Sequence, residues 1–124
     1  MVFRASELTK LFPWLETSTL MNLVTYGIIK PYKNKQGRGT SRLYSIENAF
    51  QLLAWKQISS LGLPYATLKE IIPKLKQPSS PKEKYTYEKD GINLTIHTSK
   101  INKKLKDLIK KYEISEKNRS GKNK

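Results

Sequence analysis

The sequence predicts a mainly α-helical fold with small β-hairpins, on three observations. Apolar residues recur at helical spacing in several segments, most clearly between Ile46 and Leu61. Gly27 and Gly62 each follow such a segment and mark its end. Asp90-Gly91 separates two runs rich in aromatic and β-branched residues, which is typical of a two-residue hairpin turn because both turn positions require positive φ. We therefore expect helices to form the core and strands to occur only in short pairs.

Two short helices with a tight turn between them are predicted near the N-terminus. Ser6 can cap the first, which extends to Phe12. Thr17 or Ser18 can open the second, which ends at Gly27. The outward face of the second helix consists of Ser18, Met21, Asn22 and Thr25. This arrangement is typical of a helix-turn-helix unit, whose second helix can enter the major groove of DNA.

A basic β-hairpin, or wing, is predicted to follow. Residues 28–32 are suited to begin a strand, and residues 42–44 can return antiparallel to it across a glycine-containing segment. No acidic residue occurs between Glu16 and Glu47. The cations inside this gap are Lys30, Lys33, Lys35, Arg38 and Arg42.

Two further helices complete the predicted N-terminal domain. Ser45 caps a long helix that Gly62 terminates, and Pro64 fits the first turn of the next helix. The apolar residues expected on the inner side of the long helix are Ile46, Ala49, Phe50, Leu53, Ala54, Ile58 and Leu61. Pro73 predicts a kinked or frayed end to the second of these helices.

The C-terminal part is predicted to be a β-hairpin followed by a helix. The hairpin contains Asp90-Gly91 at its turn, and Thr98 or Ser99 caps a helix that extends to Tyr112. The predicted organisation is a winged helix-turn-helix domain at 1–76, a linker at 77–84, a hairpin-helix region at 85–113 and a disordered basic tail at 114–124.

Composition narrows the classes of function. The 124 residues include 24 Lys and Arg against 10 Asp and Glu, a net charge of +14 that attracts polyanions. Nucleic acid is therefore the leading candidate partner. There is no cysteine, which excludes disulfides and thiolate metal sites. No membrane-spanning run or signal peptide is visible, so we expect a cytoplasmic, nucleoid-associated protein.

Several landmarks, taken in order, carry a family resemblance over residues 3–75. They are Thr19-Leu20, Gly27-Ile28-Ile29, Pro31, Arg42-Leu43-Tyr44-Ser45, Leu61-Gly62-Leu63 and residues 68–72. The chain resembles the DNA-binding domain of the MerR family of bacterial transcription regulators. The resemblance implies a second helix in the major groove and a wing on the phosphate backbone, with Arg42 and Tyr44 as wing residues.

Residues of two kinds are expected to contact double-stranded DNA. Short polar side chains of the second helix can meet base edges, and Asn22 is suited to an adenine edge where family members typically carry larger residues. Basic side chains of the wing can contact phosphates, which adds affinity and salt dependence without reading sequence. The candidate DNA-binding residues are Thr17, Ser18, Asn22, Thr25, Lys33, Lys35, Arg38, Arg42 and Tyr44.

The last helix is expected to support a homodimer, since helix-turn-helix proteins commonly match two-fold sites. Its candidate dimerisation residues are Ile101, Leu105, Leu108, Ile109 and Tyr112. Alternatively, this C-terminal region binds a different protein instead of a second copy of the chain. No catalytic residue, metal site or cofactor is predicted, because phosphate loops, paired carboxylates and activated nucleophiles are missing and His97 has no second ligand.

Two other functions remain open at this point. An excisionase-like architectural factor would use a related winged fold to bend DNA and would occupy several adjacent sites. An RNA-binding or antitoxin-like interaction module would bind its partner through the basic C-terminal part. The regulator, in contrast, should occupy one promoter-proximal site through the wing and the second helix.

Overall fold

The computed structural model describes residues 1–33 and 42–122, and for residues 118–122 it describes the backbone alone. Within these ranges the chain forms five α-helices, one 3-10 helix and two pairs of short antiparallel strands. The elements in order are β1 (Val2–Phe3), α1 (Ala5–Leu11), α2 (Thr17–Thr25), β2 (Tyr44–Ser45), α3 (Ile46–Ser59), α4 (Tyr65–Ile71), η1 (Ile72–Lys74), β3 (Tyr85–Lys89), β4 (Ile92–Ile96) and α5 (Thr98–Lys122). The predicted combination of helices with small β pairs is confirmed.

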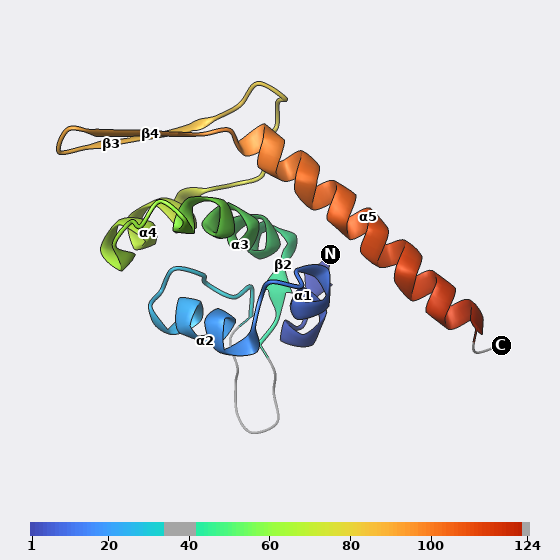
Figure 1. Cartoon of the computed structure of the whole chain (residues 1–124). Coiled ribbons are helices and arrows are strands. Elements are labelled where there is room, and N and C mark those ends of the chain that lie inside the picture. The colour runs from blue at the N-terminus through green and yellow to red at the C-terminus, as the bar shows by residue number, and fades with distance from the viewer. Residues whose placement is uncertain (34–41, 123–124) are drawn as a thin grey trace.

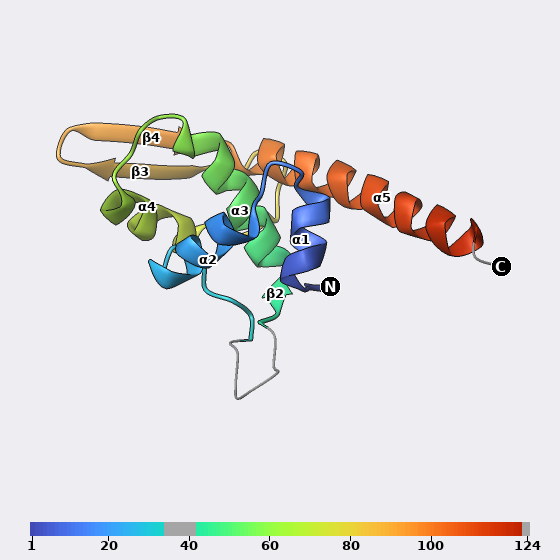
Figure 2. The same ribbon diagram turned by 60° about the horizontal axis from the view of Figure 1, so that its bottom comes forward.

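Helix α3 lies at the centre of the molecule. Figure 1 shows α1 and α2 on one side of it and the β3–β4 hairpin on the other, above α4. Helix α5 packs against α3 and α1, and its C-terminal half extends beyond the body in both views (Figures 1 and 2). One core cluster joins side chains from α1 to α5, including Leu8, Phe50 and Leu105, which have no exposed surface. Both sides of the molecule are thereby fixed to the same central helix.

Helix ends follow the local signals with two differences. Ser45 caps α3 as predicted, since its Oγ accepts from the Asn48 N–H at 3.1 Å. Helix α1 begins at Ala5, and the predicted cap at Ser6 is wrong because Ser6 lies inside the first turn. Glu7 satisfies this end instead, its Oε1 accepting from the Arg4 N–H at 2.9 Å. Helix α2 begins at Thr17, the first of the two predicted starts.

The β3–β4 hairpin forms with the predicted turn. Its register pairs Tyr85 with Ile96 and Lys89 with Ile92. Asp90 and Gly91 have φ values of +52° and +83°, as the two positions of such a turn require. A local turn with this chemistry determines the register without help from the rest of the chain.

The first strand pair differs from the predicted wing. Residues 28–32 form no strand, because the N–H groups of Ile28 and Ile29 donate to the Leu23 carbonyl and close the end of α2. Strand β2 pairs with β1, which the sequence did not indicate, in the register Phe3 with Tyr44. The expected hairpin is represented by a single antiparallel bridge between Lys33 and Leu43. Residues 34–41, which form most of the segment between them, lie outside the described residues.

Two expected element ends are wrong. Helix α3 ends at Ser59, which leaves Leu61 in a turn with 58% of its surface exposed, outside the core. Helix α5 continues as backbone helix to Lys122, well past the predicted end at Tyr112 and into the expected tail. No proline follows Tyr112, and Glu113, Glu116 and Lys117 favour the helix, so no strong local signal stops it at the predicted end.

Candidate nucleic-acid interface

Helix α2 presents an uncharged polar face to solvent. Leu20 and Leu23 each have 1% of their surface exposed, so they fix the rotation of the helix about its axis. The residues exposed on the other side are Thr17, Ser18, Met21, Asn22 and Thr25. Every predicted base-reading residue is thus exposed. No residue of α2 carries a charge.

Gly27 closes the end of α2. Its φ of +76° lies in the left-handed region, and the following Ile28 N–H donates to the Leu23 carbonyl at 2.9 Å. A Cβ built at Gly27 would lie 3.2 Å from the Lys69 Cε, so the side chain of Lys69 covers this corner from α4. This turn directs the chain from α2 back into the core through two buried isoleucines, Ile28 and Ile29.

Asn48, which the sequence analysis did not select, holds the segment after α2 against α3. Its side chain is 4% exposed. Its Oδ1 accepts from the N–H groups of Tyr32 at 3.1 Å and Ser45 at 2.9 Å, while its Nδ2 donates to the Lys30 carbonyl at 2.8 Å. The available signal was the Ser45 to Asn48 spacing, which is that of a capping box. That pattern reveals the cap but not the contact with residues 30–32.

The bridge between Lys33 and Leu43 lies where the base of the predicted wing was expected. The Lys33 N–H donates to the Leu43 carbonyl at 3.1 Å, and the Leu43 N–H donates to the Lys33 carbonyl at 2.9 Å. Lys33 is exposed and Arg42 is partly buried, so the bridge brings two predicted phosphate-binding residues to one place. The other two, Lys35 and Arg38, lie outside the described residues. Lys30 adds an exposed cation just before the bridge.

Tyr44 requires a correction. It was expected among the DNA-binding residues, but its side chain is 2% exposed and belongs to the core. Burial raises the pKa of its hydroxyl, and the positive charge of Arg42 offsets part of that effect. Strand β2 turns this ring inward when it pairs with β1, because alternate residues of a strand point to opposite sides.

An exposed aromatic pair borders α2 and was also missed. The rings of Tyr26 and Tyr65 stack with centroids 4.9 Å apart and planes inclined by 23°. Tyr26 is 53% exposed and Tyr65 is 54% exposed, so much of the pair's surface faces water. The pair connects the end of α2 to the start of α4. Tyr65 follows Pro64 at a helix start, which gives no local hint that it meets Tyr26.

The candidate dimerisation residues of α5 all pack on the chain's own core. Leu105 and Ile109 are buried, with 0% and 8% of their surface exposed, and Ile101, Leu108 and Tyr112 pack against the cluster while partly exposed. The opposite faces of α5 carry exposed lysines: Lys100, Lys103, Lys104, Lys106, Lys110, Lys111 and Lys117. The homodimer stays a prediction, and the two buried side chains contribute to folding of the single chain.

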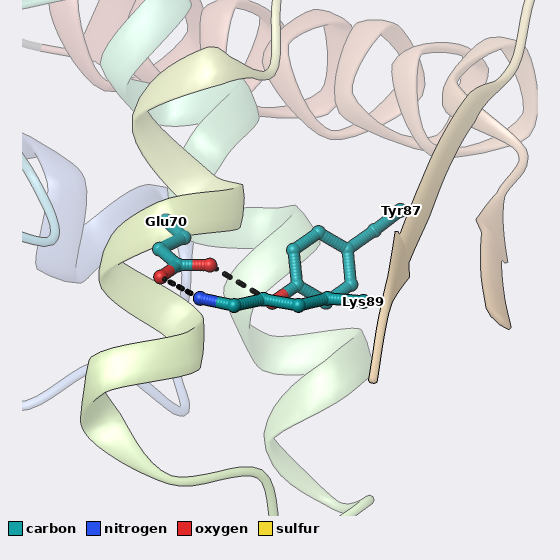
Figure 3. Close-up of polar contacts among 3 residues, drawn as sticks. All are labelled: Glu70, Tyr87 and Lys89. Carbon is teal, nitrogen blue, oxygen red and sulfur yellow. Dashed lines mark hydrogen bonds and ion pairs between the residues drawn. The ribbon is translucent and has the colours of Figure 1, made fainter. Parts of the chain in front are cut away.

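A polar cluster attaches the β3–β4 hairpin to α4 (Figure 3). The carboxylate of Glu70 accepts from the Tyr87 hydroxyl and from the Lys89 Nζ, each at 2.8 Å. The hydrogen bond from Lys89 is the main reason that the pKa of Glu70 is lowered. The same contact raises the pKa of Lys89. In Figure 1 the β3–β4 hairpin lies on the side of α4 away from α2, while the start of α4 meets the end of α2 through Tyr65 and Tyr26.

No family model matches the chain, and no curated protein is significantly similar to it in sequence. In the part of the chain that the structure describes, no helix combines the length and apolar character needed to cross a bilayer. The same residues contain no group of three or more His, Cys, Asp or Glu side chains placed to hold a metal ion. The geometry around α2 therefore carries the functional inference.

Proposed function

We propose that this chain is a winged helix-turn-helix transcription regulator that binds double-stranded DNA. Helix α2 enters the major groove, and the basic wing contacts the adjacent phosphates. The observation that carries the proposal is the exposed, uncharged polar face of α2 with exposed cations beside it. In Figure 1, α2 and the segment leading to Lys33 lie on the same side of α3.

The dimensions and side chains of α2 suit direct readout of bases. An α-helix is about 10–12 Å across with its side chains, which fits the ~12 Å width of the major groove. The nine residues of α2 give it a length of about 13 Å. Asn22 can pair in a bidentate manner with N6 and N7 of adenine, and Thr25 or Ser18 can bond to several base edges. Met21, 53% exposed, offers an apolar contact for a thymine methyl group. Short side chains allow the helix backbone to approach the groove closely.

The cations beside α2 supply the affinity that these neutral contacts lack. Lys30 and Lys33 are exposed, and no acidic residue lies between Glu16 and Glu47 to repel phosphates. Each phosphate that such a residue neutralises releases counterions, so binding weakens as salt rises. Asn48 gives this arrangement its rigidity because its amide positions residues 30 and 32 against α3.

A binding titration against genomic DNA fragments at several salt concentrations tests the proposal. We expect saturable binding to a small set of fragments. In the variant Lys33→Ala/Arg42→Ala, the slope of log K against log salt should fall by up to about 0.9 for each lost phosphate contact. The matched control is Lys110→Ala/Lys111→Ala on α5, which removes the same charge and should leave the slope nearly unchanged.

Two results would contradict the proposal in different ways. Equal affinity for every fragment would show that α2 does not read bases. A slope unaffected by Lys33→Ala/Arg42→Ala but reduced by the α5 control would place the nucleic-acid contact on α5. Binding to several adjacent sites with bending of the DNA, measured by circular permutation in gels, would replace the regulator by the architectural factor.

A further inference from the structure

A cleft opens between residues 78–81 and the first two turns of α5. Its volume is about 440 Å³, within the range of ~300–1,000 Å³ typical of small-molecule sites. The lining residues are Pro78, Ser79, Ser80, Pro81, Ser99, Lys100, Asn102, Lys103 and Lys106. Figure 1 shows the chain leading into β3 on the side of α3 away from α2. The cleft is therefore separate from the proposed DNA surface.

The first wall is an ordered turn, although its sequence is that of a linker. The Ser79 N–H donates to the Glu83 Oε2 at 3.2 Å, the Lys82 N–H donates to the Ser80 Oγ at 3.2 Å, and the Glu83 N–H donates to the Ser80 carbonyl at 3.1 Å. Pro81 restricts the backbone of the same turn. Hydrogen bonds and proline together give this wall a defined shape without a bound ligand.

Two hydrogen bonds attach this turn to α5. The Thr98 hydroxyl donates to the Glu83 carbonyl at 2.9 Å, and the Gln77 Nε2 donates to the Asn102 Oδ1 at 3.0 Å. Thr98 and Asn102 are 3% and 6% exposed, so both contacts are largely shielded from water. The two walls of the cleft are consequently held at a constant separation, which lowers the ordering cost of binding.

The second wall consists of cations at helical spacing. Ser99, Lys103 and Lys106 are four and then three residues apart, which places them on one face of α5, and Lys100 stands beside them. Lysine ammonium groups, serine hydroxyls and an asparagine amide are all hydrogen-bond donors. No carboxylate is among the lining residues, but the Glu83 carboxylate already accepts from the Ser79 N–H and hydroxyl, so the donors left for a ligand are those of Ser80, Ser99, Asn102 and the lysines. The cleft thus combines positive charge with directional donors.

We propose that this cleft binds a small anion with two or more phosphate groups. Phosphate oxygens accept several hydrogen bonds and interact strongly with ammonium groups, which matches the donors present. Two adjacent phosphates can contact both walls, whereas an apolar ligand would find few partners among serines and lysines. A free phosphorylated compound fits better than a phosphodiester backbone, because the cleft faces away from α2. This preference for a free compound over a phosphodiester backbone rests on the proposed function of α2, whereas the binding of phosphate groups by the cleft does not.

Pyrophosphate is a suitable probe, titrated into the isotope-labelled full chain at constant ionic strength and followed by amide chemical shifts. We expect saturable shifts confined to the turn and to the first two turns of α5, including Ser80 and Lys103. The variant Lys103→Glu/Lys106→Glu should weaken binding at least tenfold. The control Lys104→Glu/Lys110→Glu changes charge equally on the same helix and should weaken it less than threefold. Far-UV circular dichroism verifies that both variants are folded.

Three outcomes would overturn the proposal. Shifts that spread over all lysine-rich segments without saturating would show a general charge effect. Equal losses in the two variants would show that the cleft is not involved. Displacement of bound pyrophosphate by short duplex DNA of unrelated sequence would mean that the cleft holds a phosphodiester backbone. The affinity of Lys103→Glu/Lys106→Glu for DNA should equal that of the control variant Lys104→Glu/Lys110→Glu. This measurement tests the proposed DNA-binding function separately from the binding of pyrophosphate.

Discussion

Helices α2 and α5 both bury an apolar face in the same core, yet their exposed faces differ. The exposed face of α2 is polar and uncharged, with short side chains such as Asn22 and Thr25. The exposed faces of α5 carry lysines along most of the length that the structure describes. Short neutral side chains can contact base edges but not neutralise phosphates, whereas lysines can contact either phosphates or guanine. The two exposed faces are thus chemically distinct, and only that of α2 lacks the charge that drives non-specific binding to phosphates.

The supports of the two helices differ as well. The region after α2 is held by a buried amide, Asn48, that bonds to three backbone groups. The start of α5 is held by Asn102, whose Oδ1 accepts one hydrogen bond from the side-chain amide of Gln77. A buried polar group with several backbone partners leaves more unsatisfied groups behind when it is removed. The α2 side should therefore respond more strongly to loss of its asparagine.

The largest expected effect follows from this difference. Asn48→Ala should lower the free energy of unfolding by about 2–3 kcal/mol, because it leaves partly buried donors at Tyr32 and Ser45 and a partly buried acceptor at Lys30 without their protein partner. Asn102→Ala should cost about 1 kcal/mol. Urea denaturation of both variants measures the two values. Equal losses would show that the two supports are equivalent.

The second prediction compares the glycine that ends α2 with the glycine of the β3–β4 turn. Gly27 and Gly91 have φ values of +76° and +83°, so alanine at either position should cost about 1–2 kcal/mol of stability. Only Gly27→Ala should also weaken DNA binding, because it disturbs the end of the helix proposed to enter the groove. Thermal unfolding and the fragment titration measure the two effects. A similar loss of DNA affinity in Gly91→Ala would contradict the assignment of α2.

The smallest effect concerns the contact of Glu70 with Lys89 and Tyr87, which joins α4 to the β3–β4 hairpin. Because the folded-state pKa of Glu70 is lowered, its contribution is present above the ordinary value of 4.5 and disappears as pH falls through the folded-state pKa. Glu70→Gln should thus be less stable than the natural chain at pH 7, with the gap narrowing in acid. Both side chains of the ion pair are substantially exposed, so the change is small.

Urea denaturation of Glu70→Gln at neutral and acidic pH provides the check. Glu88→Gln is the matched control, since Glu88 bonds to Asn93 within the hairpin and not to α4. A gap that widens toward low pH would contradict the role of the Glu70 carboxylate.

The parts of the fold that local chemistry determines could be predicted from the sequence. Asp90 and Gly91 adopt positive φ because the two-residue hairpin turn requires it, and Gly27 does so because it ends α2. Ser45 caps α3 by accepting from the Asn48 N–H, three residues away. Predictions failed where contacts between segments distant in the sequence determine the structure. Strand β1 exists because Phe3 pairs with Tyr44, and no pattern within residues 1–4 indicates that partner.

The candidate site shows the same division. Exposure of Ser18, Asn22 and Thr25 followed from the helical period, because Leu20 and Leu23 face the core. The burial of Tyr44 and the contact of Asn48 with residues 30–32 depend on tertiary pairing, so the sequence did not reveal them. The stacking of Tyr26 on Tyr65 belongs to the same class, since α2 and α4 meet only in the folded chain.

The most direct test of the central claim is the ratio of affinities for the preferred fragment and for a fragment of unrelated sequence. Asn22→Ala should reduce this ratio by about 5- to 150-fold, the loss of one bidentate base contact, without changing the salt slope. Lys111→Ala on α5 should leave the ratio unchanged. A ratio unaffected by Asn22→Ala, or reduced equally by Lys111→Ala, would contradict recognition of DNA by α2.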